Sequence, residues 1–241
     1  MKKSISAYEA KNRVEEYDYH MKIMHPNRTK MAEISLEFMP FNIATPLHAM
    51  DLGVGTGFFC DKFLKQFPKS HVVALDGAAS MVDCAKSRLR KCASSVDFVV
   101  ADFRCFDNVV PGEKLFDVVF SSFALHHLTK KEKLQFLKIV LKKLKPGGLF
   151  FNTDCIIGET PELETQFQKL RVEGIVERAG KSDQRYKDFN TTRTLLDKLE
   201  AQENDMPIKN SEEIKIMSDA GFKNIDILWK EYREVVLHGK K

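Results

Sequence analysis

Three glycines at alternate positions, Gly53, Gly55 and Gly57, stand just after an acidic residue, Asp51, and have the clearest chemical meaning in the sequence. A short apolar run precedes them and residues 58–67 have helical periodicity, so the glycines lie in a turn between a strand and a helix. Glycine adopts the backbone angles that such a turn needs, and without a side chain it lets a ligand lie against the main chain. The helix N-terminus adds unpaired N–H groups. The sequence therefore predicts a ligand-binding loop.

The residues of the loop narrow the choice of ligand. The dinucleotide fingerprint Gly-x-Gly-x-x-Gly requires a glycine where the chain has Phe58, and no lysine follows the glycines as a phosphate-binding loop requires. The Asp51 carboxylate would repel a pyrophosphate and attract an ammonium or sulfonium group. We therefore expect a ligand with a cationic centre.

Two further aspartates stand at the ends of predicted strands. Asp76 ends an apolar run that begins at residue 71, and it lies 23 residues after Gly53. A carboxylate at the tip of the second strand can accept hydrogen bonds from both ribose hydroxyls of an adenosine. Asp102 follows a third run over residues 96–101. Because parallel strands end at one edge of the sheet, the three aspartates are expected around one cleft.

The order acid-x-Gly-x-Gly-x-Gly, with aspartates at the ends of the next two strands, resembles the motifs of the class I S-adenosylmethionine-dependent methyltransferases. The resemblance covers residues 45–155 and includes the Lys145-Pro146-Gly147-Gly148 segment before the fifth strand. It implies an α/β fold with a doubly wound, mainly parallel, seven-stranded sheet and a helical cap. It also implies S-adenosyl-L-methionine as the cofactor and S-adenosyl-L-homocysteine as the product.

Several side chains are expected to contact this cofactor. Met81, near the start of a helix that Ser80 is expected to cap, can touch the adenine. The resemblance implies that Asp102 accepts from the adenine amino group and that Phe103 flanks the ring, while residues directly after the fourth strand line the methionine end. The expected contacts are Asp51, Gly53, Gly55, Gly57, Asp76, Met81, Asp102, Phe103 and Ser121.

Methyl transfer is an in-line displacement, so most of the rate can come from holding the nucleophile close to the methyl group and collinear with the leaving sulfur. An oxygen or nitrogen nucleophile also benefits from a base, and the candidates are His126, His127 and Tyr17. The two histidines follow the fourth strand, so at least one is expected to face the cleft. No pattern identifies any of the three as a base, and we expect the histidines to shape the pocket.

The elements that position these residues divide the chain into four segments. Residues 1–44 are expected to form an N-terminal cap of two helices with a break at Pro26, and residues 45–154 the cofactor-binding core. Residues 155–210 are rich in charged side chains and helical in pattern, and are expected to complete the cap. Residues 211–241 are expected to hold the last core helix and an antiparallel hairpin.

Composition limits the classes of partner. The chain has 241 residues, a net charge of +4 and five cysteines without metal-binding spacing, so no metal site is predicted. Seven lysines between residues 130 and 145 are expected on a solvated helix face, without aromatic residues to stack bases, so no nucleic acid is expected as a direct partner. No export leader and no membrane span are expected. We expect a cytoplasmic protein that acts on a small molecule; a homodimer stays open.

Three functions are compatible with these motifs. The first, which we favour, is a methyltransferase that modifies an oxygen, nitrogen or carbon nucleophile of a small molecule. The second is an enzyme similar to those that make carboxy-S-adenosyl-L-methionine for tRNA wobble modification, which would need a cap arginine to hold the carboxylate. The third is a regulator that binds S-adenosylmethionine without catalysis. The cap arginines considered for the second function are Arg28, Arg171, Arg178, Arg185 and Arg193.

Overall fold

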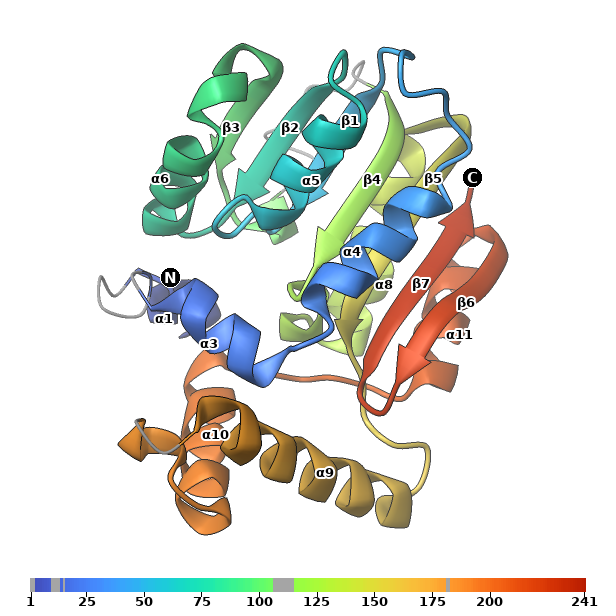
Figure 1. Ribbon diagram of the computed structural model, residues 1–241. Coiled ribbons are helices and arrows are strands. Elements are labelled where there is room, and N and C mark those ends of the chain that lie inside the picture. The colour runs from blue at the N-terminus through green and yellow to red at the C-terminus, as the bar shows by residue number, and fades with distance from the viewer. Residues whose placement is uncertain (1–2, 10–13, 15, 106–114, 181–182) are drawn as a thin grey trace.

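The core of the protein is one sheet of seven strands in the order β3-β2-β1-β4-β5-β7-β6 (Figure 1). A computed structural model describes residues 3–9, 14, 16–105, 115–180 and 183–241. Strand β7 runs antiparallel to both of its neighbours, and the other strands are parallel. The strand order reverses between β1 and β4, and a ligand in such a sheet binds at the carboxyl ends of the strands beside this reversal. The strands are β1 (His48–Leu52), β2 (His71–Asp76), β3 (Val96–Val100), β4 (Phe116–Ser122), β5 (Leu144–Cys155), β6 (Lys223–Glu231) and β7 (Glu234–Lys240).

Helices cover both faces of the sheet because its central strands are apolar on both sides. On β2, Val72 and Ala74 join one core layer while Val73 and Leu75 join the other, as the pleat of a strand requires. This arrangement confirms the expected doubly wound α/β fold. One face packs against α4 (Arg28–Glu37), α5 (Phe58–Gln66) and α6 (Ala79–Arg88), and the other against α8 (Lys130–Lys143) and α11 (Asn210–Ala220).

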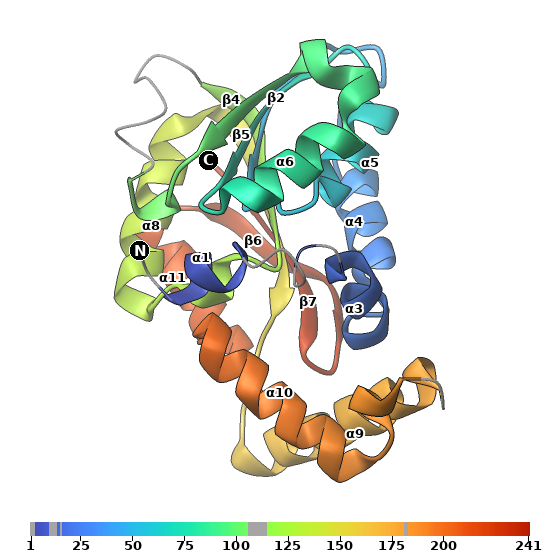
Figure 2. The same cartoon turned by 90° about the vertical axis from the view of Figure 1, so that its left-hand side faces the viewer.

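A cap of helices lies over the carboxyl ends of the parallel strands. Figure 2 shows α9 and α10 as a separate layer, with α1 and α3 between that layer and the strand ends. Val172 and Ile175 of α9 are fully buried in an apolar cluster that α3 and α10 complete. The cap helices are α1 (Lys3–Ala7), α3 (Tyr17–Met24), α9 (Pro161–Ala179) and α10 (Phe189–Glu203). Short 3-10 turns are η1 (Arg90–Ser95), η2 (Phe103–Cys105), η3 (Leu125–His127) and η4 (Gln184–Tyr186).

Helix α4 packs with the helices that cover the sheet, contrary to the prediction that it belongs to the N-terminal cap. Its Ala32 and Leu36 pack with Phe59 and Phe63 of α5 in the core. The break at Pro26 therefore separates a cap helix, α3, from a core helix, α4. The apolar side chains of α4 cover the apolar surface of the sheet layer. Helical periodicity alone does not show which surface an amphipathic helix covers.

Two boundaries differ from those predicted. Helix α6 begins at Ala79 with Ala78 as its N-cap, because the Ser80 hydroxyl donates to the Glu9 carboxylate instead of capping the helix. Strand β5 begins at Leu144, so the Lys145-Pro146-Gly147-Gly148 segment lies within the strand. The register with β4 shifts there, which accommodates the segment.

Two lysines of α8 lie away from solvent, contrary to the expectation of a solvated face. Lys133 is fully buried, and its ammonium donates to the Glu213 carboxylate of α11. Lys143 is only 4% exposed. The cause is that α11 packs on α8 and covers part of the face that the sequence assigned to water. None of the described helices is long and apolar enough to cross a membrane.

Candidate active site

The loop between β1 and α5 needs glycine at each of its three positions. Gly53, Gly55 and Gly57 have φ values of 74°, 52° and 79°, in the left-handed region that other residues rarely adopt. A Cβ on Gly53 would lie 2.4 Å from the Cβ of Ala124, and a Cβ on Gly57 would lie 3.2 Å from the Cα of Ala85. The loop therefore packs closely between the turn after β4 and helix α6.

A cavity opens at the carboxyl ends of β1, β2 and β4, and the N-terminal helices close one side of it. Ile5 of α1 lies against Gly77, so that a Cβ on this glycine would stand 2.7 Å from the Ile5 side chain. The lining residues that the sequence predicted are Tyr17, Gly53, Gly55, Asp76, Met81, Asp102, Phe103 and His127. The additional ones are Ile5, Tyr8, Gly77, Ala78, Arg104, Ser122, Phe123 and Ala124. We call this the cofactor cavity.

Asp76 is held at the tip of β2 by the backbone around it. Its carboxylate accepts hydrogen bonds from the N–H of Gly55 at 2.8 Å and from the N–H of Ala78 at 2.9 Å. Burial raises the pKa of Asp76, and these two N–H groups oppose the increase. Each oxygen has a second lone pair that these bonds leave unused, so the carboxylate can also accept from a ligand.

Asp102 lies in the cofactor cavity but is already engaged. Its carboxylate accepts from the backbone N–H of Arg104 at 3.0 Å and from the Arg104 guanidinium at 2.9 and 2.6 Å. Phe103 lies beside it, and Met81 of α6 also reaches the cavity. No sequence pattern predicts Arg104 as a partner, because an arginine two residues after an aspartate has no fixed structural meaning.

Three expected contacts lie outside the cavity lining. Asp51 is 1% exposed, because the chain turns back over it into α5. The Ser121 hydroxyl donates to the Leu52 carbonyl at 2.8 Å and so ties β4 to β1. Gly57 is the N-cap residue of α5 and packs on α6. These residues support the glycine loop without lining the cavity. The next residue after Ser121, Ser122, lines the cavity instead.

The environment of Asp51 opposes a charged carboxylate. Neither of its oxygens has a hydrogen bond of accepted geometry among the described residues. Burial raises the pKa of Asp51 to about 8, and the nearby Asp76 adds to the increase, while the backbone N–H of Cys60 acts in the opposite direction. The prediction that an ionised Asp51 attracts the cationic ligand directly therefore does not agree with the structure.

A second cavity continues from the first into the cap, and we call it the acceptor cavity. Tyr8, Tyr17 and Phe123 line both cavities, so the two meet at these rings. The Tyr8 hydroxyl donates to the Glu203 carboxylate at 2.7 Å. The remaining lining residues are Met21, Met24, His25, His126, Cys155, Arg171, Glu200, Glu203, Asp205, Pro207 and Arg233.

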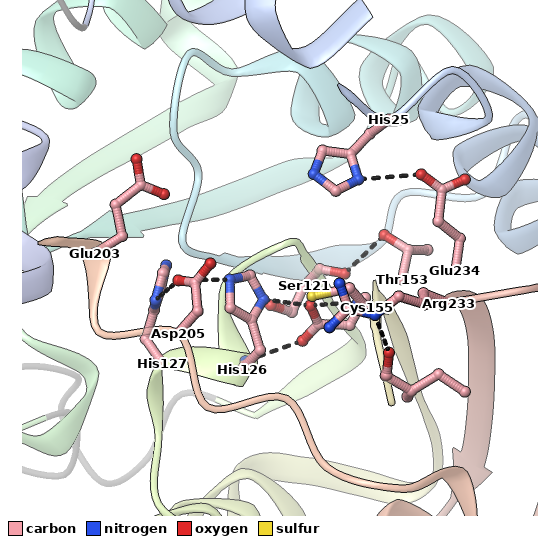
Figure 3. A network of polar contacts seen from close by, with 12 residues as sticks. His25, Ser121, His126, His127, Thr153, Cys155, Glu203, Asp205, Arg233 and Glu234 are labelled. Carbon is pink, nitrogen blue, oxygen red and sulfur yellow. Dashed lines mark hydrogen bonds and ion pairs between the residues drawn. The ribbon is translucent and has the colours of Figure 1, made fainter. Parts of the chain in front are cut away.

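His127 lines the cofactor cavity and His126 lines the acceptor cavity, and Figure 3 shows both rings next to Asp205. The Nδ1 atom of His126 lies 2.6 Å from Asp154, and its Nε2 atom lies 3.5 Å from Asp205. Burial lowers the pKa of His126, but Cys155 and these two carboxylates outweigh the burial and raise it well above its usual range. Burial likewise raises the pKa of Asp205, and the two histidines outweigh it, so this pKa is lowered. The surroundings of His126 therefore favour its protonated form.

The cap arginines lie in three different places. Arg28 pairs with Asp18, Arg185 with Asp183, and Arg193 with Asp197, all outside both cavities. Arg171 reaches the acceptor cavity, where it pairs with Glu200. Arg178 lies in a neighbouring hollow and donates to the Ile23 carbonyl at 2.7 Å. Arg233, which the sequence placed in the final strand, also lines the acceptor cavity.

Tyr8, Phe123 and Asp205 are site residues that sequence reasoning missed. Asp205 follows Asn204, which ends α10 in a left-handed conformation, with φ of 57°. An asparagine in this position is a known sign of a helix end, but it does not reveal what the next side chain faces. The role of Tyr8 and Phe123 can be recognised only in the folded protein, where α1 lies beside the turn after β4.

Comparisons with known proteins show which proteins the chain resembles. A methyltransferase domain family matches residues 49–148. The chain is 24% identical over 182 residues to carboxy-S-adenosyl-L-methionine synthase of Nautilia profundicola. The aligned residues make up 75% of this chain and 71% of that protein. It is 27% identical over 139 residues to malonyl-[acyl-carrier protein] O-methyltransferase of a Paenibacillus species, covering 57% of this chain and 49% of that protein. Human N-acetylserotonin methyltransferase in complex with S-adenosylmethionine shares the fold, with a TM-score of 0.60, 17% identity, and coverage of 95% of this chain and 55% of that chain.

The reversal of strand order, the glycine loop and Asp76 define a nucleotide-binding α/β protein with its ligand at the strand ends. The domain match over residues 49–148 and the shared fold make this part of the chain similar to the class I S-adenosylmethionine-dependent methyltransferases. The chain spans only about half of the length of the malonyl-carrier and human relatives.

Proposed function

We propose that the protein transfers the methyl group of S-adenosylmethionine to a hydroxyl or amino group of a small polar molecule. The observation that carries this proposal is the junction of the two cavities at Tyr8, Tyr17 and Phe123. One cavity has a glycine loop and carboxylates suited to an adenosine, and the other is lined by charged side chains. The sulfonium methyl group and the acceptor would meet at this junction.

In this proposal the adenosine binds along the tips of β2 and β3. Asp76 accepts from the ribose hydroxyls with the lone pairs that Gly55 and Ala78 leave unused. The adenine lies between Met81 and Phe103, and its amino group reaches Asp102 beside Arg104. The methionine part then extends over the glycine loop towards the acceptor cavity.

We assign the two histidines to shaping the site, because His126 is poorly suited to act as a base. Its ring lies between Asp154 and Asp205, and both carboxylates favour the protonated form, which cannot accept a proton. Catalysis then depends mainly on holding the acceptor in line with the sulfonium carbon. Tyr17, which lines both cavities, is placed to do so.

The charges in the acceptor cavity favour a polar acceptor. Glu200, Glu203 and Asp205 contribute carboxylates, while Arg171 and Arg233 contribute guanidinium groups. Burying such groups beneath an apolar molecule would remove water without providing hydrogen-bond partners, at a cost of about 2 kcal/mol or more for each group. An acceptor with hydroxyl, amino or carboxylate groups avoids this cost.

The proposal is tested by labelling. Methyl-labelled S-adenosylmethionine is incubated with the protein and fractionated pools of small hydroxyl and amino compounds, and the products are identified by mass spectrometry. We expect label in a small polar compound together with an equal amount of S-adenosylhomocysteine. Label found only in protein or nucleic acid would refute the proposed acceptor class.

A second candidate is the synthesis of a carboxylated cofactor. Two observations favour it: the similarity to the Nautilia synthase over 75% of the chain, and the presence of Arg171 and Arg233 where a carboxylate on the cofactor would need a cation. Mass spectrometry of the nucleoside that copurifies separates the two functions. A mass increase of one carboxyl group over S-adenosylmethionine would favour the synthase, and unmodified cofactor or S-adenosylhomocysteine the methyltransferase.

A further inference from the structure

We infer that His126, His127 and Asp205 form a binding site for a divalent transition-metal ion at the junction of the cofactor and acceptor cavities. Their ligand atoms, a ring nitrogen from each histidine and a carboxylate oxygen, all lie within 4.8 Å of one another. Two imidazoles and one carboxylate are a common ligand set for Zn²⁺ and Fe²⁺, with open positions left for a substrate.

The distances fit a metal. The Asp205 Oδ1 atom lies 3.5 Å from Nε2 of His126 and 3.1 Å from Nδ1 of His127. In a tetrahedral zinc site, bonds of about 2.0 to 2.1 Å separate neighbouring ligand atoms by about 3.4 Å. The observed separations lie on either side of this value, so an ion can bind with only small side-chain shifts.

Two of the three ligand atoms pair with each other, since Nδ1 of His127 lies 3.1 Å from Oδ1 of Asp205. Nδ1 of His127 and Oδ1 of Asp205 are buried, and neither has a hydrogen bond of accepted geometry among the described residues. His127 as a whole is only 7% exposed. Buried polar atoms without a well-formed hydrogen bond are costly, and a bound ion or water is one explanation for them. Figure 3 shows the Asp205 carboxylate beside both histidine rings, with dashed lines to each of them.

The third ligand, His126, has a carboxylate on its other ring nitrogen, as metal-binding histidines commonly do. Nδ1 of His126 lies 2.6 Å from the Asp154 carboxylate, which leaves Nε2 facing Asp205. A carboxylate on the far nitrogen fixes the ring and its tautomer in most metal sites. Asp154 also accepts from the backbone N–H groups of His126 and Cys155, at 3.1 and 2.8 Å, and is fully buried.

The backbone brings Asp205 to the histidines in a defined way. Asn204 ends α10 with a positive φ of 57°, which turns the chain back towards the sheet. The N–H of Met206 then donates to the His126 carbonyl at 2.8 Å, which holds the two segments together. The two negative charges of the Asp154 and Asp205 carboxylates would balance the two positive charges of a divalent ion.

The position of the site gives the ion a role that rests on the proposed function. His127 lines the cofactor cavity, while His126 and Asp205 line the acceptor cavity, so an open position of the ion would face the acceptor. A hydroxyl bound there would have a lower pKa and be a stronger nucleophile. The ion would also take the place of the proton on His126.

The test measures metal retention, with Zn²⁺ and Co²⁺ as probes. The chelator-treated full-length protein is incubated with each ion and dialysed against metal-free buffer, and its metal content is measured. We expect one equivalent in the wild type, visible absorption bands from bound Co²⁺, and a rise in Tm with Zn²⁺. Asp205→Asn and His127→Gln, which preserve side-chain size, should each lose all three signals while staying folded by circular dichroism.

The control is His71→Gln, which removes the exposed His71–Asp97 pair, with its 3.1 Å contact, from a distant strand. This variant should keep the equivalent of metal. A wild type that retains no metal, or equal retention in all variants, would overturn the inference. Calorimetric titration with S-adenosylhomocysteine of the same preparations tests the cofactor site separately, so that failure of the metal site is not mistaken for failure of the proposed function.

Discussion

Replacing the buried Asp51 with asparagine should change how the stability of the protein depends on pH. The pKa of Asp51 rises from 3.8 to about 8 in the folded protein, and its two oxygens have no hydrogen bond of accepted geometry among the described residues. A folded-state pKa above the unfolded value means that the folded state holds the proton more tightly. The stability associated with this proton is present below pH 3.8 and is lost as the pH rises through about 8.

The size of the effect follows from that interval. Each pH unit between the two pKa values costs about 1.4 kcal/mol, so the whole interval corresponds to about 6 kcal/mol. Between pH 6 and pH 9, where urea unfolding is practical, the expected loss is about 3 kcal/mol. Asparagine has nearly the same shape but no proton to lose. The free energy of unfolding of Asp51→Asn, relative to the wild type, should therefore rise by about 3 kcal/mol from pH 6 to pH 9.

The assay is urea unfolding of both proteins at several pH values, with the difference taken at each pH so that the other titrating groups cancel. Ser121→Ala is the matched control: it removes a buried hydrogen bond to the Leu52 carbonyl nearby but no titratable group. Its difference from the wild type should be the same at every pH. Unfolding free energies of wild type and Asp51→Asn that run parallel from pH 6 to pH 9 would refute the account of Asp51.

Three further results are expected. Gly53→Ala should destabilise the protein by clearly more than Gly180→Ala in thermal unfolding, because both glycines have positive φ but a Cβ on Gly53 would lie 2.4 Å from another atom, whereas a Cβ on Gly180 would have no described residue beyond its chain neighbours within 4 Å; equal losses would argue against close packing of the loop. Deleting residues 1–26 should weaken S-adenosylhomocysteine binding by more than about tenfold in calorimetry while the circular dichroism of the sheet remains, since α1 and α3 line the cofactor cavity; unchanged affinity would remove them from the site. Bulk tRNA should bind weakly and with a steep salt dependence, because Lys133 and Lys143 are buried and unavailable to phosphates; submicromolar binding at physiological salt would contradict this.

Much of the fold could be predicted because its signals are local. The glycine loop, the apolar runs before Asp76 and Asp102, and the final hairpin each have a pattern within a few residues, and the structure confirms the mainly parallel, seven-stranded sheet. The assignment of α4 was wrong because an amphipathic helix has the same pattern whether it covers a sheet or a cap. The burial of Lys133 was missed for a similar reason, since its partner Glu213 lies on a distant helix.

The site was predictable where backbone geometry determines it and not where distant segments meet. Gly53, Gly55 and Asp76 line the cofactor cavity as expected, because the strand ends fix their positions. Asp51 was assigned to the ligand from its charge, yet the turn into α5 buries it, and no residue within the motif signals this. The partnership of Asp205 with the histidines depends on how α10 docks on the core, which no local pattern encodes.

Binding of S-adenosylmethionine with its ribose on Asp76 can be measured by calorimetric titration of S-adenosylhomocysteine into the wild type and Asp76→Asn. Asparagine replaces a charged acceptor by a neutral one, and hydrogen bonds to a charged group contribute about 1.5 to 3 kcal/mol each. We predict one site per chain in the wild type and an affinity lowered by more than about tenfold in the variant. An absence of binding to the wild type, or equal affinity in the two proteins, would contradict this mode of binding.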